Sequence, residues 1–193
     1  MDKIIARWEW RTFGYTFGIA EEKIKTFPAK VRESSEVYIL SARSMDNTKI
    51  RDMLMDIKYL VQVNENKLEQ WYPLMKAGFP IQADQVRETV KAWKIDVPET
   101  AITSYTYDDF LNALVQKHSD LRMVHVYKER HGYTVNNCIV ETANLKFDNQ
   151  PIRTVAVEHE DPKLVWDTVC MLGLEKLENI NYLKALKKFA AMP

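Results

Sequence analysis

Charged and apolar residues alternate along several stretches of this chain, and the alternation predicts β-strands. Successive side chains of a strand point to opposite faces. In segment 154–160 one face holds Thr154, Ala156, Glu158 and Glu160, and the other holds Val155 and Val157. A single strand of this kind is most often a surface strand with its charges in water. The interpretation changes because the pattern recurs.

At least five predicted strands have one charged face and one apolar face. The charged faces hold Arg7, Glu9, Arg11, Lys49, Arg51, Asp56, Lys58, Lys128, Arg130, Glu141, Glu158 and Glu160. The opposite faces hold Trp8, Trp10, Ile50, Met55, Ile57, Cys138, Val140, Val155 and Val157. If the apolar faces pack beneath helices, the charged faces must point at one another. A closed antiparallel barrel produces that arrangement, because interior and exterior positions alternate along every strand.

The same periodicities place the elements along the chain. Strands are predicted at 4–12, 36–41, 49–51 and 54–60, and three more between Val124 and Asp161, with turns around His131-Gly132 and around 148–151. Segment 65–76 fits a strand or a helix equally well. Apolar spacing and end signals predict helices at 20–27, 83–94, 106–117, 161–172 and 182–191.

The predicted fold is therefore α+β, a closed antiparallel β-barrel of about eight strands with helices packed on its outside. The length of 193 residues suits one domain, which we take as 1–193 with a helical insertion at about 83–118. A hydrophobic content of 46% argues against disorder. Equal numbers of basic and acidic residues, 27 of each, give no global attraction to nucleic acid or to a membrane surface.

The N-terminal segment and the cysteines indicate the compartment. The opening residues lack the apolar run of a secretory signal, and no stretch approaches membrane-spanning length. Cys138 and Cys170 have no partner motif and no metal-ligand spacing. We therefore expect a cytoplasmic protein with reduced thiols, no nucleic-acid partner and no membrane partner. The oligomeric state stays open.

An interior lined by so many charges must be wet, mutually paired or filled by a ligand, because dry unpaired charges are very costly to bury. Lysine and arginine side chains bind phosphate groups. Carboxylates among them bind a hard cation such as Mg²⁺ or Mn²⁺, which bridges to phosphate oxygens. The expected ligand is a small polyphosphate or nucleotide with its metal ion.

The order of the charged motifs resembles the CYTH superfamily, the triphosphate tunnel metalloenzymes. Its opening Glu-x-Glu-x-Lys strand is similar to Arg7-Trp8-Glu9-Trp10-Arg11. Later basic motifs of the family resemble Lys49 with Arg51, then Lys58, then Lys128 with Arg130. Its acidic positions resemble Glu141 and the pair Glu158 and Glu160, and its C-terminal Tyr and Lys resemble Tyr182 with Lys184 or Lys187. The resemblance covers Ile4 to Lys188 and is weakest between Ala83 and Asp120.

The resemblance implies a set of site residues. The phosphate-binding residues it implies are Arg7, Arg11, Lys49, Arg51, Lys58, Lys128, Arg130, Lys184 and Lys187. The implied cation ligands are Glu9, Glu158 and Glu160, and the implied catalytic residues are Glu9, Lys58 and Glu141. One position departs from the family, because Arg7 stands where a glutamate helps to hold the cation. A guanidinium there attracts phosphate or Glu9 instead.

Two functions remain open. The first is a metal-dependent phosphohydrolase acting on inorganic triphosphate or an organic triphosphate; the family also includes adenylate cyclases and thiamine triphosphatases. The second is a non-catalytic module that binds polyphosphate or a nucleotide, and Arg7 is the feature that favours it. A lipocalin-like carrier of apolar ligands would need an apolar interior, and the charged inner faces argue against it.

Overall fold

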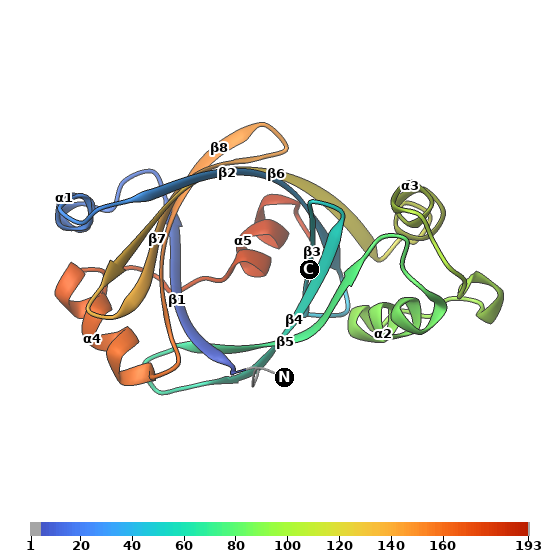
Figure 1. Cartoon of the computed structure of the whole chain (residues 1–193), viewed down its shortest axis with the longest axis horizontal. Helices are drawn as coiled ribbons and strands as arrows, with labels where there is room; N and C mark the ends of the chain where they lie inside the picture. The colour runs from blue at the N-terminus through green and yellow to red at the C-terminus, as the bar shows by residue number, and fades with distance from the viewer. Residues whose placement is uncertain (1–4, 193) are drawn as a thin grey trace.

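Eight strands form the centre of the molecule in a computed structural model that describes residues 5–192. The strands are β1 (Arg7–Gly14), β2 (Lys30–Ser41), β3 (Asn47–Arg51), β4 (Leu54–Val63), β5 (Glu69–Gly78), β6 (Leu121–Val135), β7 (Cys138–Phe147) and β8 (Gln150–His159). They close into an antiparallel barrel in the order β1-β5-β4-β3-β2-β6-β7-β8 (Figure 1). The predicted closed antiparallel barrel is confirmed.

The helices are short. They are α1 (Ile19–Lys25), α2 (Ala83–Trp93), α3 (Tyr107–Asp109), α4 (Pro162–Leu172) and α5 (Tyr182–Phe189), with a 3-10 turn η1 (Glu99–Ala101) and a π-helical turn η2 (Phe110–Val115). Capping fixes several ends: Asp161 caps α4 ahead of Pro162, and Gly173 ends that helix at φ 81°. The helix predicted at 106–117 begins at its Thr106 cap and continues as α3 and η2.

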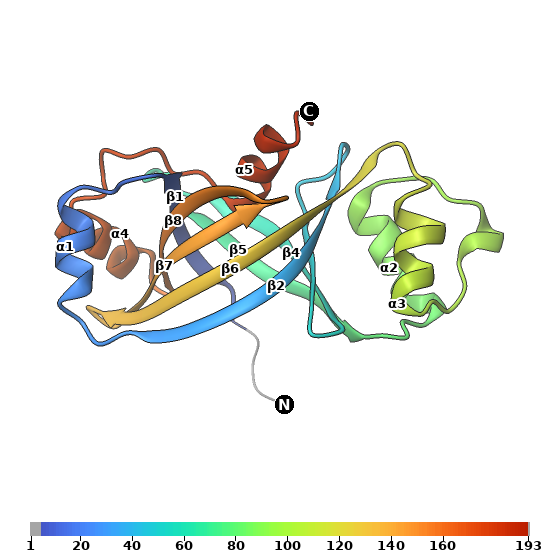
Figure 2. The ribbon, with the colours of Figure 1, turned by 90° about the horizontal axis from the view of Figure 1, so that it is seen from above.

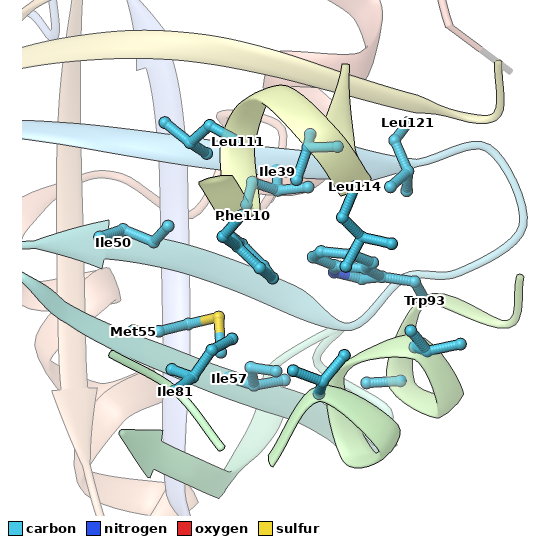
Figure 3. Close-up of a cluster of buried hydrophobic side chains, with 14 of the residues drawn as sticks. Ile39, Ile50, Met55, Ile57, Ile81, Trp93, Phe110, Leu111, Leu114 and Leu121 are labelled. Atoms are coloured by element: carbon cyan, nitrogen blue, oxygen red, sulfur yellow. The ribbon is translucent and has the colours of Figure 1, made fainter. Parts of the chain in front are cut away.

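Two apolar cores lie outside the barrel. One joins α2 and η2 to the outer faces of β2, β3 and β4, and it includes Trp93, Phe110, Met55 and Ile57 (Figure 3). The other joins α1 and α4 to the outer faces of β1, β7 and β8, and it buries both tryptophans of the first strand. These cores use the apolar strand faces that the sequence pattern identifies.

Helix α5 forms a third core with the inner face of the barrel. Leu183 and Leu186 pack with Tyr38 and Val126. Tyr38 lies on the same strand face as Glu36, and Val126 on the same face as Lys128. Figure 2 shows α5 over one mouth of the barrel, opposite the mouth at which β1 begins. The interior is therefore apolar at the end covered by α5 and charged toward the other end.

The hairpin of β6 and β7 corrects one predicted turn. β6 runs without interruption through His131 and Gly132, which pair with Val31 and Lys30 of β2. The chain reverses at Asn136-Asn137 instead, where both residues have positive φ, 49° and 62°. Asparagine tolerates this conformation, and two such residues form a tight hairpin turn.

Other boundaries also moved. β2 begins at Lys30, six residues before the predicted start, and the ambiguous segment after Glu65 contains strand β5. The predicted start of the first strand at Ile4 lies outside the described residues. Among residues 5–192 no helix is long and apolar enough to cross a membrane.

Candidate functional site

The charged part of the barrel interior encloses a cavity of about 270 Å³. Side chains from every strand except β5, together with Tyr182 of α5, line it. Its basic residues are Arg7, Arg11, Arg32, Lys49, Arg51, Lys58, Lys128 and Arg130. Its acidic residues are Glu9, Glu36, Asp56, Glu141 and Glu158. Eight basic residues against five acidic residues leave three positive charges in excess, although the whole chain is neutral.

The most deeply buried cations of the cavity lie at the end covered by α5, which we call its floor (Figure 2). The Tyr182 ring forms that floor, with the Arg11 guanidinium and the Lys128 ammonium each 4.6 Å from its centroid. The side chains of Arg11 and Lys128 are 5% and 9% exposed, whereas Arg32 is 55% exposed. Arg32 therefore lies at the mouth. An anion entering the cavity meets less and less solvent screening as it approaches the floor.

Arg11 connects three carboxylates. Its Nε donates to Glu9 Oε1 at 2.7 Å, its Nη1 lies 3.4 Å from Glu141 Oε1, and its Nη2 lies 3.8 Å from Glu158 Oε1. Arg130 reaches the other oxygen of Glu141, with Nε 2.6 Å from Oε2. The pairing that the sequence suggested between Arg7 and Glu9 is thus made by Arg11, and Arg7 is exposed at the start of β1.

The pKa values of these three carboxylates are shifted in different directions. Burial acts to raise the pKa of Glu141, but the charges of Lys128, Arg11 and Arg130 outweigh it and lower that pKa to about 2. Burial also opposes the ionisation of Glu9, and Arg11 overcomes it, so the pKa of Glu9 is lowered. Burial and the neighbouring Glu9 charge raise the pKa of Glu158 to about 7. Glu9 and Glu158 lie directly opposite each other across β1 and β8.

A further buried carboxylate, Glu36 on β2, is surrounded by hydroxyl groups and cations. Glu36 Oε1 lies 3.3 Å from both Ser34 Oγ and Arg51 Nη1, and Oε2 lies 3.1 Å from the Tyr38 hydroxyl and 3.6 Å from Lys128 Nζ. Burial acts against ionisation, yet Lys128 and Lys49 keep the pKa of Glu36 lowered. The side chain is almost fully buried, so Glu36 is a fixed negative charge in the cavity wall.

Most of the residues expected from the sequence lie in this cavity, and three do not. Glu160 follows the last residue of β8 and is exposed. Lys184 on α5 pairs with Glu69 at 3.0 Å, away from the cavity. Lys187 lines a separate pocket together with residues 42–45, which lie between β2 and β3. By contrast, the predicted β3–β4 hairpin brings Lys49 opposite Asp56, with 3.8 Å between Nζ and Oδ2.

The cavity carboxylates are suited to a cation that a bound ligand also coordinates, rather than to a cation coordinated by protein side chains alone. Within residues 5–192 no group of three histidine, cysteine, aspartate or glutamate side chains is arranged to hold a metal ion. Glu9 and Glu158 nevertheless form an adjacent pair whose negative charge is only partly compensated. Mg²⁺ is commonly held by one or two carboxylates plus substrate phosphates, and this pair meets that requirement.

The sequence matches no protein-family model and no curated protein. It is similar in structure to a Hippeastrum protein, HpAC1, named as an adenylyl cyclase and described as having a dominant triphosphatase activity: 11% identity, 95% of this chain, 96% of that chain, TM-score 0.55. A conserved hypothetical protein from Pyrococcus furiosus matches at 18% identity, 92% and 98% coverage, TM-score 0.52. The PH1012 protein from Pyrococcus horikoshii matches at 20% identity, 92% and 97% coverage, TM-score 0.52.

These matches define the class of fold. The matches cover 92% to 95% of this chain, so the likeness extends over nearly its whole length. The barrel fold that the family resemblance implies is thereby confirmed. Because the identities are at most 20%, the likeness shows the fold alone and does not transfer an activity.

Proposed function

We propose that this protein is a metal-dependent phosphohydrolase that binds inorganic triphosphate or the triphosphate group of an organic molecule in the barrel cavity. The observation that supports this most strongly is the cavity with buried cations at its floor and three positive charges in excess. A linear triphosphate carries several negative charges and many acceptor oxygens. Its oxygens can accept charge-assisted hydrogen bonds from lysine and arginine side chains along the whole depth of such a cavity.

Each group of cations has its own role in this proposal. Arg11 and Lys128 bind the innermost phosphate, because they are least exposed and reach the floor. Lys49, Arg51 and Arg130 bind the phosphates nearer the mouth. Glu141 acts through its ion pairs: with its pKa near 2 it stays ionised and holds Arg11 and Arg130 in place. Lys58 lies near Glu9 and Glu158 and offsets their charge.

The Glu9 and Glu158 pair would hold Mg²⁺ or Mn²⁺ together with phosphate oxygens. The cation would neutralise charge on the phosphoryl group and lower the pKa of an attacking water. Without a cation, Glu158 has a pKa of about 7 and is half protonated near neutral pH. A bound cation would favour the ionised carboxylate, so cation binding would release this proton.

A non-catalytic triphosphate-binding module remains the second candidate, and Arg7 is the observation that favours it. A third carboxylate at this position would complete a three-carboxylate cation site, whereas a guanidinium repels the cation. Arg7 lines the mouth of the cavity. The expected behaviour of such a module is tight triphosphate binding with little turnover.

Phosphate release tests the proposal. Wild-type protein is incubated with tripolyphosphate and either Mg²⁺ or Mn²⁺, beside Glu158→Gln and Glu160→Gln. We expect metal-dependent release of phosphate that Glu158→Gln reduces at least tenfold and that Glu160→Gln leaves near wild type, because only Glu158 lines the cavity. Binding of tripolyphosphate without any release would support the second candidate. Equal losses in both variants would contradict the cation role assigned to Glu158.

A further inference from the structure

A groove of about 620 Å³ lies on the outer face of the barrel, between α3 and the turn that joins β7 to β8. Outward-facing residues of β2, β3 and β6 form its base. We call it the aromatic groove, and its apolar and aromatic lining residues include Val37, Ile50, Met53, Tyr107, His125 and Tyr127. Its volume is in the range of sites that hold small organic molecules, which are lined mainly by such side chains.

The aromatic groove adjoins the mouth of the charged cavity. β2 and β3 pair only between 37–39 and 48–50, so the strands separate at Glu36 and Arg51. These two residues line both the cavity and the groove. Asp52, in the groove wall, lies 3.4 Å from Arg32 and 3.7 Å from Arg51. A molecule held at the cavity mouth can therefore extend over the β3–β4 turn into the groove.

The lining indicates which chemical group the groove accepts. Tyr127 is 36% exposed, and Lys146 Nζ lies over its ring at 5.7 Å from the centroid. A planar group can stack on the exposed part of this ring. The charged side chains in the lining, beyond those shared with the cavity, are Asp52, Asp148 and Lys146. Two acidic groups against one basic group disfavour a further phosphate. The lining fits an uncharged or cationic heteroaromatic ring with polar edges.

We propose that the aromatic groove binds the heteroaromatic group of an organic triphosphate whose phosphates occupy the barrel cavity. This inference rests on the triphosphate binding proposed above. It selects between the two substrate classes left open there, because an inorganic triphosphate would use only the cavity. An organic triphosphate with the matching ring gains stacking on Tyr127 and burial against Met53 and Ile50.

Calorimetric titration tests this inference. Wild-type protein is titrated with tripolyphosphate, the four common ribonucleoside triphosphates and thiamine triphosphate. We expect at least one organic triphosphate to bind at least tenfold tighter than tripolyphosphate, and Tyr127→Ala to reduce that preference about tenfold. Tyr15→Ala is the matched control, because Tyr15 is 71% exposed and lines neither the groove nor the cavity.

Three results would overturn the inference. One is a set of organic triphosphates that all bind no tighter than tripolyphosphate. Another is an equal effect of Tyr127→Ala on tripolyphosphate and on the preferred organic ligand. The third is a homodimer that Tyr127→Ala dissociates, since a second copy would then cover the groove. If tripolyphosphate and all organic triphosphates fail to bind, the proposed function fails instead.

Discussion

Arg11 is the residue on which the cavity depends most. Its guanidinium contacts Glu9, Glu141 and Glu158 and lies over the Tyr182 ring. Such a buried charge is tolerated because it is paired on several sides. A bound phosphate must share or replace these carboxylates, so the ion pairs that stabilise the free protein also moderate its affinity.

Glu158 gives the cavity a pH dependence that can be measured. Its pKa is about 7 in the folded protein and 4.5 when unperturbed. Between these values the folded state binds the proton more tightly than the unfolded state, so stability falls as the pH rises from 4.5 to 7. We compare the unfolding free energies of Glu158→Gln and wild type at two pH values. From pH 4.5 to pH 8 their difference should shift in favour of the variant by on the order of 1 to 3 kcal/mol.

Urea unfolding at a series of pH values measures this effect. Glu160→Gln serves as the control, because Glu160 is exposed and outside the cavity. Parallel stability profiles for wild type and Glu158→Gln would contradict the raised pKa of Glu158, which burial and the Glu9 charge produce.

Arg7 leads to a second prediction at this scale. Arg7→Glu adds a carboxylate on the strand face of Glu9 and at the cavity mouth. We expect Mn²⁺ to bind roughly tenfold tighter and tripolyphosphate to bind more weakly in the absence of metal, since each change follows the sign of the charge. Titration calorimetry with both ligands measures this, with Lys163→Glu outside the barrel as the control. Unchanged Mn²⁺ affinity would show that Arg7 does not limit cation binding.

The sequence predicted most cavity residues, and the misses have physical causes. Alternation identified the inward charges because each faced away from an apolar outer surface. Arg32, Ser34 and Glu36 were missed because β2 is polar on both faces there. The family resemblance included Glu160, but β8 ends at His159. Which way the lysines of α5 point depends on how that helix docks, and the sequence pattern does not contain that information.

At the level of elements, α5 determines the shape of the cavity. Its N-cap Asn181 accepts a hydrogen bond from Lys184 N and its side-chain amide donates to Glu69, which fixes the helix at the barrel end. Tyr182 then lies under Arg11 and Lys128 and stacks on Tyr38 at 5.4 Å. Without this helix the cavity would have no floor.

The packing of α5 is testable through Leu186, which is fully buried. Leu186→Ala removes apolar contact with the inner barrel face and is expected to cost about 2 to 5 kcal/mol of unfolding free energy. Lys188→Ala, on the exposed side of the same helix, should change stability by less than about 0.5 kcal/mol. Chemical denaturation compares the two, and equal effects would mean that α5 does not depend on this contact.

Strand positions were predictable, and their ends were less so. Gly132 resembles a turn residue, but twelve cross-strand pairs between β2 and β6 keep it in an extended strand. Tertiary pairing outweighed the local preference of glycine for turns. The chain turns instead at Asn136-Asn137, directly after Val135 and before Cys138, which form the last cross-strand pair of β6 and β7.

The whole molecule combines an interior that is charged at one end and apolar beneath α5 with two apolar cores on its outside. This arrangement requires only that each strand alternate in the right register, which many sequences satisfy. Solved structures of the same fold can therefore be 11% to 20% identical to this chain over almost its full length. Net neutrality is compatible with anion binding, because the positive excess is concentrated in the cavity and compensated elsewhere.

The central claim is that the barrel cavity binds triphosphate, and calorimetric titration with tripolyphosphate tests it most directly. Wild type is compared with Lys128→Met, which removes a deeply buried charge at the floor, and with Lys163→Met, which removes an exposed charge outside the barrel. One charge-assisted contact contributes roughly 1.5 to 3 kcal/mol. We predict saturable binding that Lys128→Met weakens at least tenfold and Lys163→Met leaves unchanged. No binding by wild type, or equal affinity in Lys128→Met, would contradict the claim.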